Sequence, residues 1–306
     1  MIVASILPNE RAARDIDAMV AKVLRDLADP DPPLQLEHVR ELLRLDRQFY
    51  SSVDTRVLEE VVHRLRVGMK QVMKRPGLLL DVVKSRKLSA LWIPDRRRIL
   101  IDSEAPPLKH RWNEAHEIGH SLIPWHDAIA HGDPQMTLRM GCELELEEEA
   151  NFAAGRLLFL GSRFDDEFRS GAVDLGSVRQ LGKRFGNTIT STLWRAVESL
   201  GERAFGLISQ HPRAQSFDQG KPLVEHFIRV PEFQRVFPRA RGEALFGCLQ
   251  SFCRRGGGPI GAGEILIADA IGEEHVFFVE CFHNGHSTLT LGRDVGLRKP
   301  VIGVVW

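Results

Sequence analysis

Apolar residues recur at helical spacing through much of the first half of the chain. The range 10–28 shows this most clearly, and the Asp-Pro-Asp-Pro-Pro run after it predicts the end of a helix. The apolar face of this predicted helix consists of Ile16, Met19, Val20, Val23 and Leu27. The same spacing predicts further amphipathic helices over 36–49 and 57–73.

After these helices the spacing of apolar residues changes from that of helices to that of short strands. Residues 88–102 read as two strands joined around Pro94-Asp95, which predicts a hairpin. Helical spacing returns over 112–122, 145–160 and 174–200, and the last range is interrupted by a turn near Gly186-Asn187.

The last hundred residues differ from the rest. A polar stretch over 211–222 reads as a surface loop, and a helical stretch follows over 231–254. From 264 to 306 the chain is rich in β-branched and aromatic residues, with candidate strands at 265–271, 275–282, 287–292 and 301–306. The pattern predicts an α+β protein with a boundary near 203.

Composition narrows the class of protein. Apolar residues make up 43% and charged residues 27%, as in globular proteins with a buried core. Lys+Arg and Asp+Glu both number 41, so bulk charge predicts no polyanionic partner. Four cysteines without a CxxC pair, no long apolar span and no basic leader predict a cytoplasmic protein without membrane contact.

The residues that carry chemistry are His116-Glu117-Ile118-Gly119-His120. On a helix, positions i and i+4 lie on the same face one turn apart, so two imidazoles there can bind one metal ion. The acid beside the first histidine can reach water activated by the ion, as a general base does. We therefore predict that His116 and His120 are metal ligands and that Glu117 is catalytic.

Two residues could complete the metal site. His126 follows His120 by six residues, but the pattern H-E-x-x-H-x-x-G-x-x-H needs glycine where this chain has Ile123. The second candidate is Glu147, from the acidic run that opens the helix over 145–160. Asn151 lies one turn beyond Glu147, and its amide oxygen could accept the ring N–H of a ligand histidine. This argument favours Glu147 and leaves His126 open.

The segments RWNEAHEIGHSL and EEEANFAAGRLLFL resemble the ImmA/IrrE family of metallo-endopeptidases, whose members carry a HEIGH-type helix and a later E-x-x-A-N helix. The chain departs from the family pattern at Ala153, Gly155 and Leu160. The resemblance is strongest over about 90–200. It implies a zincin-like, mainly helical core with a small sheet over 1–160, a helix-turn-helix-like unit over 161–203, and an α/β domain, GAF-like and sensory in some members, over 204–306.

The resemblance also implies a site and an activity. Zn²⁺ would be bound by His116, His120 and Glu147, with Asn151 behind a ligand histidine, although such ligands also accept Mn²⁺ or Fe²⁺. Glu117 would assist the attack of water on a peptide bond. The implied substrate is a regulatory protein, a helix-turn-helix transcriptional repressor cleaved in response to stress.

Other residues leave a rival hypothesis open. Arg179, Lys183, Arg184 and Arg195 give the helix-turn-helix-like region basic residues that could contact DNA phosphates or simply face solvent. The alternative to a peptidase is a non-proteolytic, metal-containing sensor or a DNA-binding transcriptional regulator.

Peptide hydrolysis also needs a second donor that stabilises the developing oxyanion. The candidates for this role are His126, His131 and Arg111.

Overall fold

The computed structural model of the chain describes residue 8 and residues 10–50, 90–93, 97–103, 107–126 and 142–298. These residues divide into two compact units. The N-terminal unit comprises the described residues up to Arg163 together with Phe185–Asn187, and the C-terminal unit comprises Phe164–Arg184 and the described residues from Thr188 onward.

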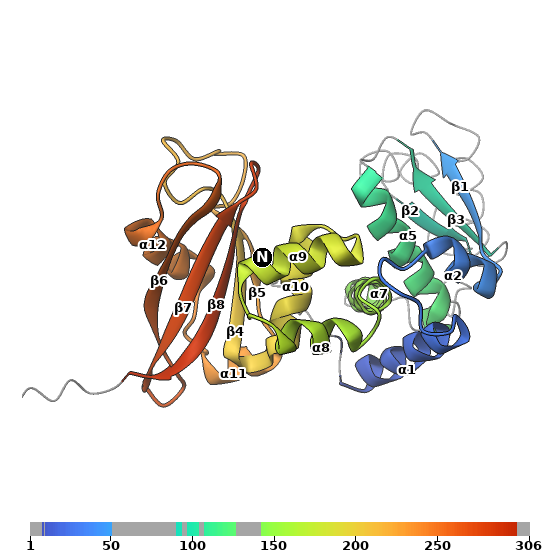
Figure 1. Ribbon diagram of the computed structural model, residues 1–306, viewed down its shortest axis with the longest axis horizontal. Helices are drawn as coiled ribbons and strands as arrows, with labels where there is room; N and C mark the ends of the chain where they lie inside the picture. Colours follow the sequence, from blue (N-terminus) through green and yellow to red (C-terminus); the bar gives the residue numbers. More distant parts are fainter. Residues whose placement is uncertain are drawn as a thin grey trace, which may run out of the picture. The chain divides into compact units, whose positions relative to one another are not determined.

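Helices and a small sheet form the N-terminal unit. Its elements are α1 (Glu10–Asp26), α2 (Leu36–Leu43), β1 (Asp46–Tyr50), β2 (Ala90–Ile93), β3 (Arg98–Asp102), α5 (Pro107–Leu122) and α7 (Cys142–Leu158). The strand order is β1-β3-β2, with β1 parallel and β2 antiparallel to β3. Helix α5 contacts β2 and β3 as well as α7, so it lies between the sheet and α7 (Figure 1).

The first helix matches its predicted pattern, but the second does not. Of the predicted face of α1, Ile16, Val20 and Val23 are buried in the unit's core. The helix expected over 36–49 is wrong beyond Leu43, because Arg44 takes a left-handed conformation (φ 54°) and β1 follows. The backbone pairing of β1 with β3 is a contact distant in sequence, which local helical spacing does not reveal.

The hairpin and the two helices that carry the motifs are found as expected. Ala90 in β2 pairs with Ile101 in β3, with the remaining pairs in antiparallel register. Helix α5 begins five residues before the predicted start at 112, and α7 begins three residues before 145. The helix predicted over 57–73, the Pro94-Asp95 turn, His131 and the strand predicted over 301–306 lie outside the described residues.

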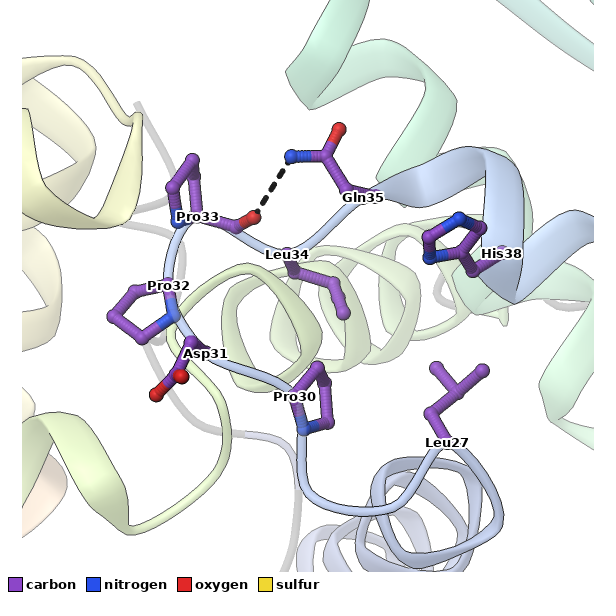
Figure 2. Close-up of a pocket in the computed structure, with 8 residues that line it drawn as sticks. All are labelled: Leu27, Pro30, Asp31, Pro32, Pro33, Leu34, Gln35 and His38. Carbon is purple, nitrogen blue, oxygen red and sulfur yellow. Dashed lines mark hydrogen bonds between the residues drawn. The ribbon is translucent and has the colours of Figure 1, made fainter.

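The proline-rich loop between α1 and α2 borders a small cavity of about 320 Å³ (Figure 2). Its lining consists of Leu27, Pro30, Asp31, Pro32, Pro33, Leu34, Gln35 and His38. Arg111 on α5 holds this loop by donating to the carbonyl of Leu34 (2.8 Å), and it also donates to the carbonyl of Phe185, distant in sequence (3.4 Å). Arg111 is thus engaged with backbone carbonyls, which argues against its role as an oxyanion donor.

A five-stranded antiparallel sheet and six helices described by the structure build the C-terminal unit. Its helices are α8 (Arg163–Ser170), α9 (Leu175–Phe185), α10 (Ile189–Leu200), the short 3₁₀ helix η2 (Gly201–Arg203), α11 (Pro231–Val236) and α12 (Gly242–Phe252). The strands are β4 (Ala204–Ser209), β5 (Val224–Ile228), β6 (Gly258–Ala268), β7 (Glu274–His283) and β8 (Thr288–Leu297), in the order β5-β4-β8-β7-β6.

Helices cover both faces of this sheet. On one face α10 packs on β4, with Val197 against Gly206. On the other face Phe252 at the end of α12 packs against Gly263 in β6. Phe205, Phe233, Phe237 and Phe277 pack their rings together on the α12 side, where ring centroids lie 4.9–6.1 Å apart.

The division into two units can be compared with the domain boundaries predicted from the sequence. The division after Arg163 lies close to the limit of 160 expected for the first domain, whereas the predicted boundary near 203 falls inside the C-terminal unit. The reason is that α10 is packed on the sheet, so the helices of 161–203 share a core with the strands after 203. The strands β4 and β5 were not predicted.

The fold is α+β. Among the described helices, none combines the length and apolar character that crossing a membrane requires.

Candidate metal centre

Helix α5 presents His116 and His120 on one face, one turn apart. Their Nε2 atoms are 3.1 Å apart, and the rings meet edge to face with centroids at 4.7 Å. The opposite side of the helix is anchored, because Ala115 and Ile118 are fully buried in the unit's core. The two rings, 14% and 16% exposed, are therefore held on a helix that cannot rotate freely.

A buried ion-pair cluster fixes the orientation of α5 further. The carboxylate of Glu114, 4% exposed, accepts from Arg40 on α2 at 2.6 Å and from Arg47 on β1 at 2.8 Å. Both arginines are brought to it by elements distant in sequence. The cluster ties the motif-bearing helix to α2 and to the sheet.

Helix α7 brings Glu147 to the two histidines. Glu147 Oε2 lies 3.2 Å from His116 Nε2, and Glu147 Oε1 lies 3.5 Å from His120 Nε2. Although 59% of the Glu147 side chain is exposed, both oxygens face the rings. Within the described ranges, these three residues form the one group of ligand atoms that gathers within 4.8 Å.

The helices can approach this closely because small residues line their contact. A Cβ on Gly119 would lie 2.7 Å from the Ala150 carbonyl oxygen and 3.2 Å from the Ala153 Cβ, which is too close for any side chain. Gly155, further along α7, has open space where a Cβ would stand. Gly119 in the motif therefore sets the distance between α5 and α7.

Asn151 lies on α7 one turn beyond Glu147, behind the first histidine. Its Oδ1 is 3.0 Å from His116 Nδ1, so the amide oxygen can accept the ring N–H. This contact holds the His116 ring with its Nε2 facing Glu147 and His120. It is the arrangement that the spacing of Glu147 and Asn151 suggests.

His126 does not join the three-residue group. Its Nδ1 lies 2.9 Å from His120 Nδ1, on the side of that ring away from His116 and Glu147. His126 Nε2 lies 2.9 Å from the carboxylate of Glu149, which also accepts from Trp125 Nε1 at 2.6 Å. The structure thus gives His126 a contact behind a ligand rather than the ligand position left open by the sequence.

Electrostatics favour a negative carboxylate facing basic nitrogens. The hydrogen bond from His116, together with the nearby His120 ring, holds the pKa of Glu147 well below its ordinary value. Burial alone would lower the pKa of His116, but the hydrogen bond to Glu147, with the charges of Glu117 and Glu147, raises it overall. Burial lowers the pKa of His120 despite Glu147. A metal cation bound among these atoms would balance the negative charge of Glu147, as the proton on the histidines does without it.

The spacing of the donor atoms fits a small divalent ion. With bonds of about 2.0–2.1 Å, a tetrahedral zinc site separates neighbouring ligand atoms by about 3.4 Å. The three separations here are 3.1, 3.2 and 3.5 Å. Two imidazole nitrogens and one carboxylate oxygen are also a donor set that zinc prefers.

Glu117 follows the first histidine and is 5% exposed. Its charge contributes to the raised pKa of His116, which places the carboxylate near that ring. Glu117 is not among the three residues whose ligand atoms gather within 4.8 Å.

The basic residues of the helix-turn-helix-like region are largely engaged within the C-terminal unit. Arg195 is 2% exposed and pairs with Asp165 at 2.5 Å, so its expected solvent-facing position is wrong. Arg184 pairs with Glu167 at 3.0 Å, and the Arg179 guanidinium lies over the ring of Phe282. Arg179, Lys183 and Arg184 are nonetheless exposed, so only Arg195 of the four is withdrawn from solvent.

No protein-family profile matches the chain, and no curated protein matches its sequence. Among solved structures, the chain is similar to a Mycobacterium tuberculosis transcriptional regulator, with a TM-score of 0.51 and 12% sequence identity. The similarity covers 92% of this chain and 76% of that protein. At this identity the likeness concerns the fold alone.

Proposed function

We propose that the chain is a zinc-dependent endopeptidase related to the ImmA/IrrE family. The observation that carries this proposal is the convergence of His116, His120 and Glu147 within 4.8 Å, with Glu117 beside the first histidine. A site that only stabilises a fold usually closes all four positions with protein ligands, whereas the three ligands found among the described residues leave a position for water or substrate.

The chain's own groups divide the work of peptide hydrolysis among them. When bound, the ion would acidify water and polarise the scissile carbonyl. Glu117 would accept the proton of the attacking water and transfer it to the leaving amine. Asn151 keeps the ring of His116 oriented, and the buried side of α5 keeps the ligands and the base in one frame.

An extended substrate could bind along β2. This strand lies at the outer position of the described three-stranded sheet and contacts α5, which carries the metal ligands. Backbone groups of an outer strand can pair with an extended peptide. The family resemblance suggests that the peptide belongs to a regulatory protein, a helix-turn-helix repressor in the cytoplasm, and that the C-terminal unit is a sensory module.

The variant Glu117→Gln tests the proposal. We expect it to bind zinc as the wild type does and to lose cleavage, because glutamine keeps the shape but cannot accept the proton. Substrates would be sought as new protein N-termini that appear, by mass spectrometry, when zinc-loaded protein is added to a cell lysate. A wild-type protein that binds zinc and yields the same termini as Glu117→Gln would contradict peptidase activity.

A second candidate is a non-proteolytic regulator that retains the metal group for structure or sensing. The similar solved structure carries the name of a transcriptional regulator, which favours this candidate. The burial of Arg195 in an ion pair with Asp165 disfavours direct DNA binding by α10. Under this candidate, Glu117→Gln would leave every regulatory effect in cells unchanged.

A further inference from the structure

A chain of hydrogen-bonding contacts leads from the candidate metal centre into the interior of the N-terminal unit. It runs from His120 Nδ1 to His126 Nδ1 (2.9 Å) and from His126 Nε2 to Glu149 Oε2 (2.9 Å). Trp125 Nε1 donates to the same carboxylate oxygen at 2.6 Å. His126 and Glu149 are 5% and 7% exposed, so water competes little for these contacts.

The chemistry of the last member sets the direction of the chain. An ionised carboxylate only accepts hydrogen bonds, so His126 must donate from Nε2 to Glu149. A neutral imidazole that carries its proton on Nε2 has a lone pair on Nδ1. In that tautomer His126 Nδ1 accepts, and His120 is the donor through Nδ1–H.

This direction has a consequence for the metal ligand. With its proton on Nδ1, His120 presents a lone pair at Nε2, the atom that faces His116 and Glu147. The opposite tautomer would carry the proton on Nε2 and would block coordination. Glu149 thus governs, through one intervening ring, which nitrogen of His120 is free.

We propose that His126 and Glu149 are positioning residues that hold His120 in its Nδ1–H tautomer and so strengthen metal binding. This inference rests on the proposed metal site, whose ligands are His116, His120 and Glu147. Partners behind ligand histidines typically contribute a factor of about 10–100 to metal affinity. Glu149 was not predicted to be part of the site, because only the turn after α5 brings His126 close enough to contact both helices.

Zinc affinity, measured by competition with a chromophoric chelator, gives the first test. We expect Glu149→Gln and His126→Phe to bind Zn²⁺ about 10–100-fold more weakly than the wild type. Glu145→Gln is the matched control, because it removes the same charge at the same two-residue distance from Glu147 but on an exposed side chain. We expect its zinc affinity to equal that of the wild type.

The tautomer itself gives a second readout that needs no metal. Long-range ¹H–¹⁵N spectra of the metal-free protein should show His120 as the Nδ1–H tautomer in the wild type and in Glu145→Gln. In Glu149→Gln this signature should be lost or mixed, even where thermal unfolding shows the variant to be folded. A merely structural role for Glu149 would change stability without changing the tautomer of His120.

The outcomes separate this inference from the proposed function. Unchanged zinc affinity and an unchanged His120 tautomer in folded Glu149→Gln would overturn the positioning role, whatever the wild type cleaves. Weakened zinc binding with a lost tautomer would support it even if the wild type cleaves no protein. If the wild type bound no zinc, the proposed function would fail, and the tautomer spectra would still decide the hydrogen-bond direction.

Discussion

Replacing Gly119 with alanine would place a methyl group where α5 and α7 are closest. The new Cβ would stand 2.7 Å from the Ala150 carbonyl oxygen and 3.2 Å from the Ala153 Cβ. Neither neighbour is the end of a flexible side chain, so neither can turn aside. The helices must separate or shift, and Glu147 lies less than one turn from Ala150 on the helix that moves.

The size of the effect follows from these distances. Relaxing 2.7 Å to an ordinary contact of about 3.4 Å requires a displacement of about 0.7 Å, beyond the roughly 0.5 Å that a preorganised site tolerates. We expect zinc affinity to fall about tenfold or more, since misplacement by about 1 Å can cost 100-fold at a functional site. Overpacking costs about 1–3 kcal/mol and the helix propensity of alanine returns about 1 kcal/mol, leaving a net loss of about 0–2 kcal/mol.

Gly155→Ala provides the matched control. It makes the same change within α7, but no atom lies within 4 Å of the new Cβ. We expect the free energy of unfolding to rise by about 0.5–1 kcal/mol with zinc affinity unchanged. Both variants would be compared by denaturant unfolding and by zinc competition. Equal zinc affinity in Gly119→Ala and the wild type would refute the argument that helix contact positions Glu147.

Three further predictions concern charged groups. Because the pKa of His116 is raised overall, zinc binding at a pH below that pKa should release about one proton from His116. Zinc affinity should therefore weaken as pH falls. Calorimetry in buffers of different ionisation enthalpy measures the number of protons released. Burial raises the pKa of Glu280, so ionising this carboxyl in the folded state lowers the free energy of unfolding as pH rises. Glu280→Gln should therefore be more stable than the wild type at pH 7 in denaturant titrations. The difference should vanish below about pH 4, where the carboxyl is protonated in both states. Glu114→Ala leaves Arg40 and a second arginine without their carboxylate and should lower the free energy of unfolding by about 3 kcal/mol, whereas an unchanged midpoint would exclude an anchoring role.

The parts of the site that the sequence predicted are those with local signals. The five-residue motif places His116 and His120 on one helical face, and Glu147 and Asn151 share a face because they are four residues apart. The structure brings these four side chains together. Local periodicity was sufficient here because each pair lies on a single helix.

Features that depend on contacts distant in sequence were not predicted. The strand β1 exists because β3 pairs with it, and its residues, Asp46–Tyr50, were expected to continue a helix. Glu149 belongs to an acidic run that is indistinguishable from a solvated face, and its partner His126 reaches it only after a turn. Arg195 was expected at the surface, because its ion-pair partner Asp165 lies on another helix and the local pattern does not reveal it.

Crystallographic data collected on both sides of the zinc absorption edge test the central claim most directly. We predict one anomalous peak at about 2.0–2.2 Å from His116 Nε2, His120 Nε2 and a carboxylate oxygen of Glu147, with His126 hydrogen-bonded behind His120. A zinc ion coordinated by His126, or bound with Glu147 turned away from both rings, would contradict the account.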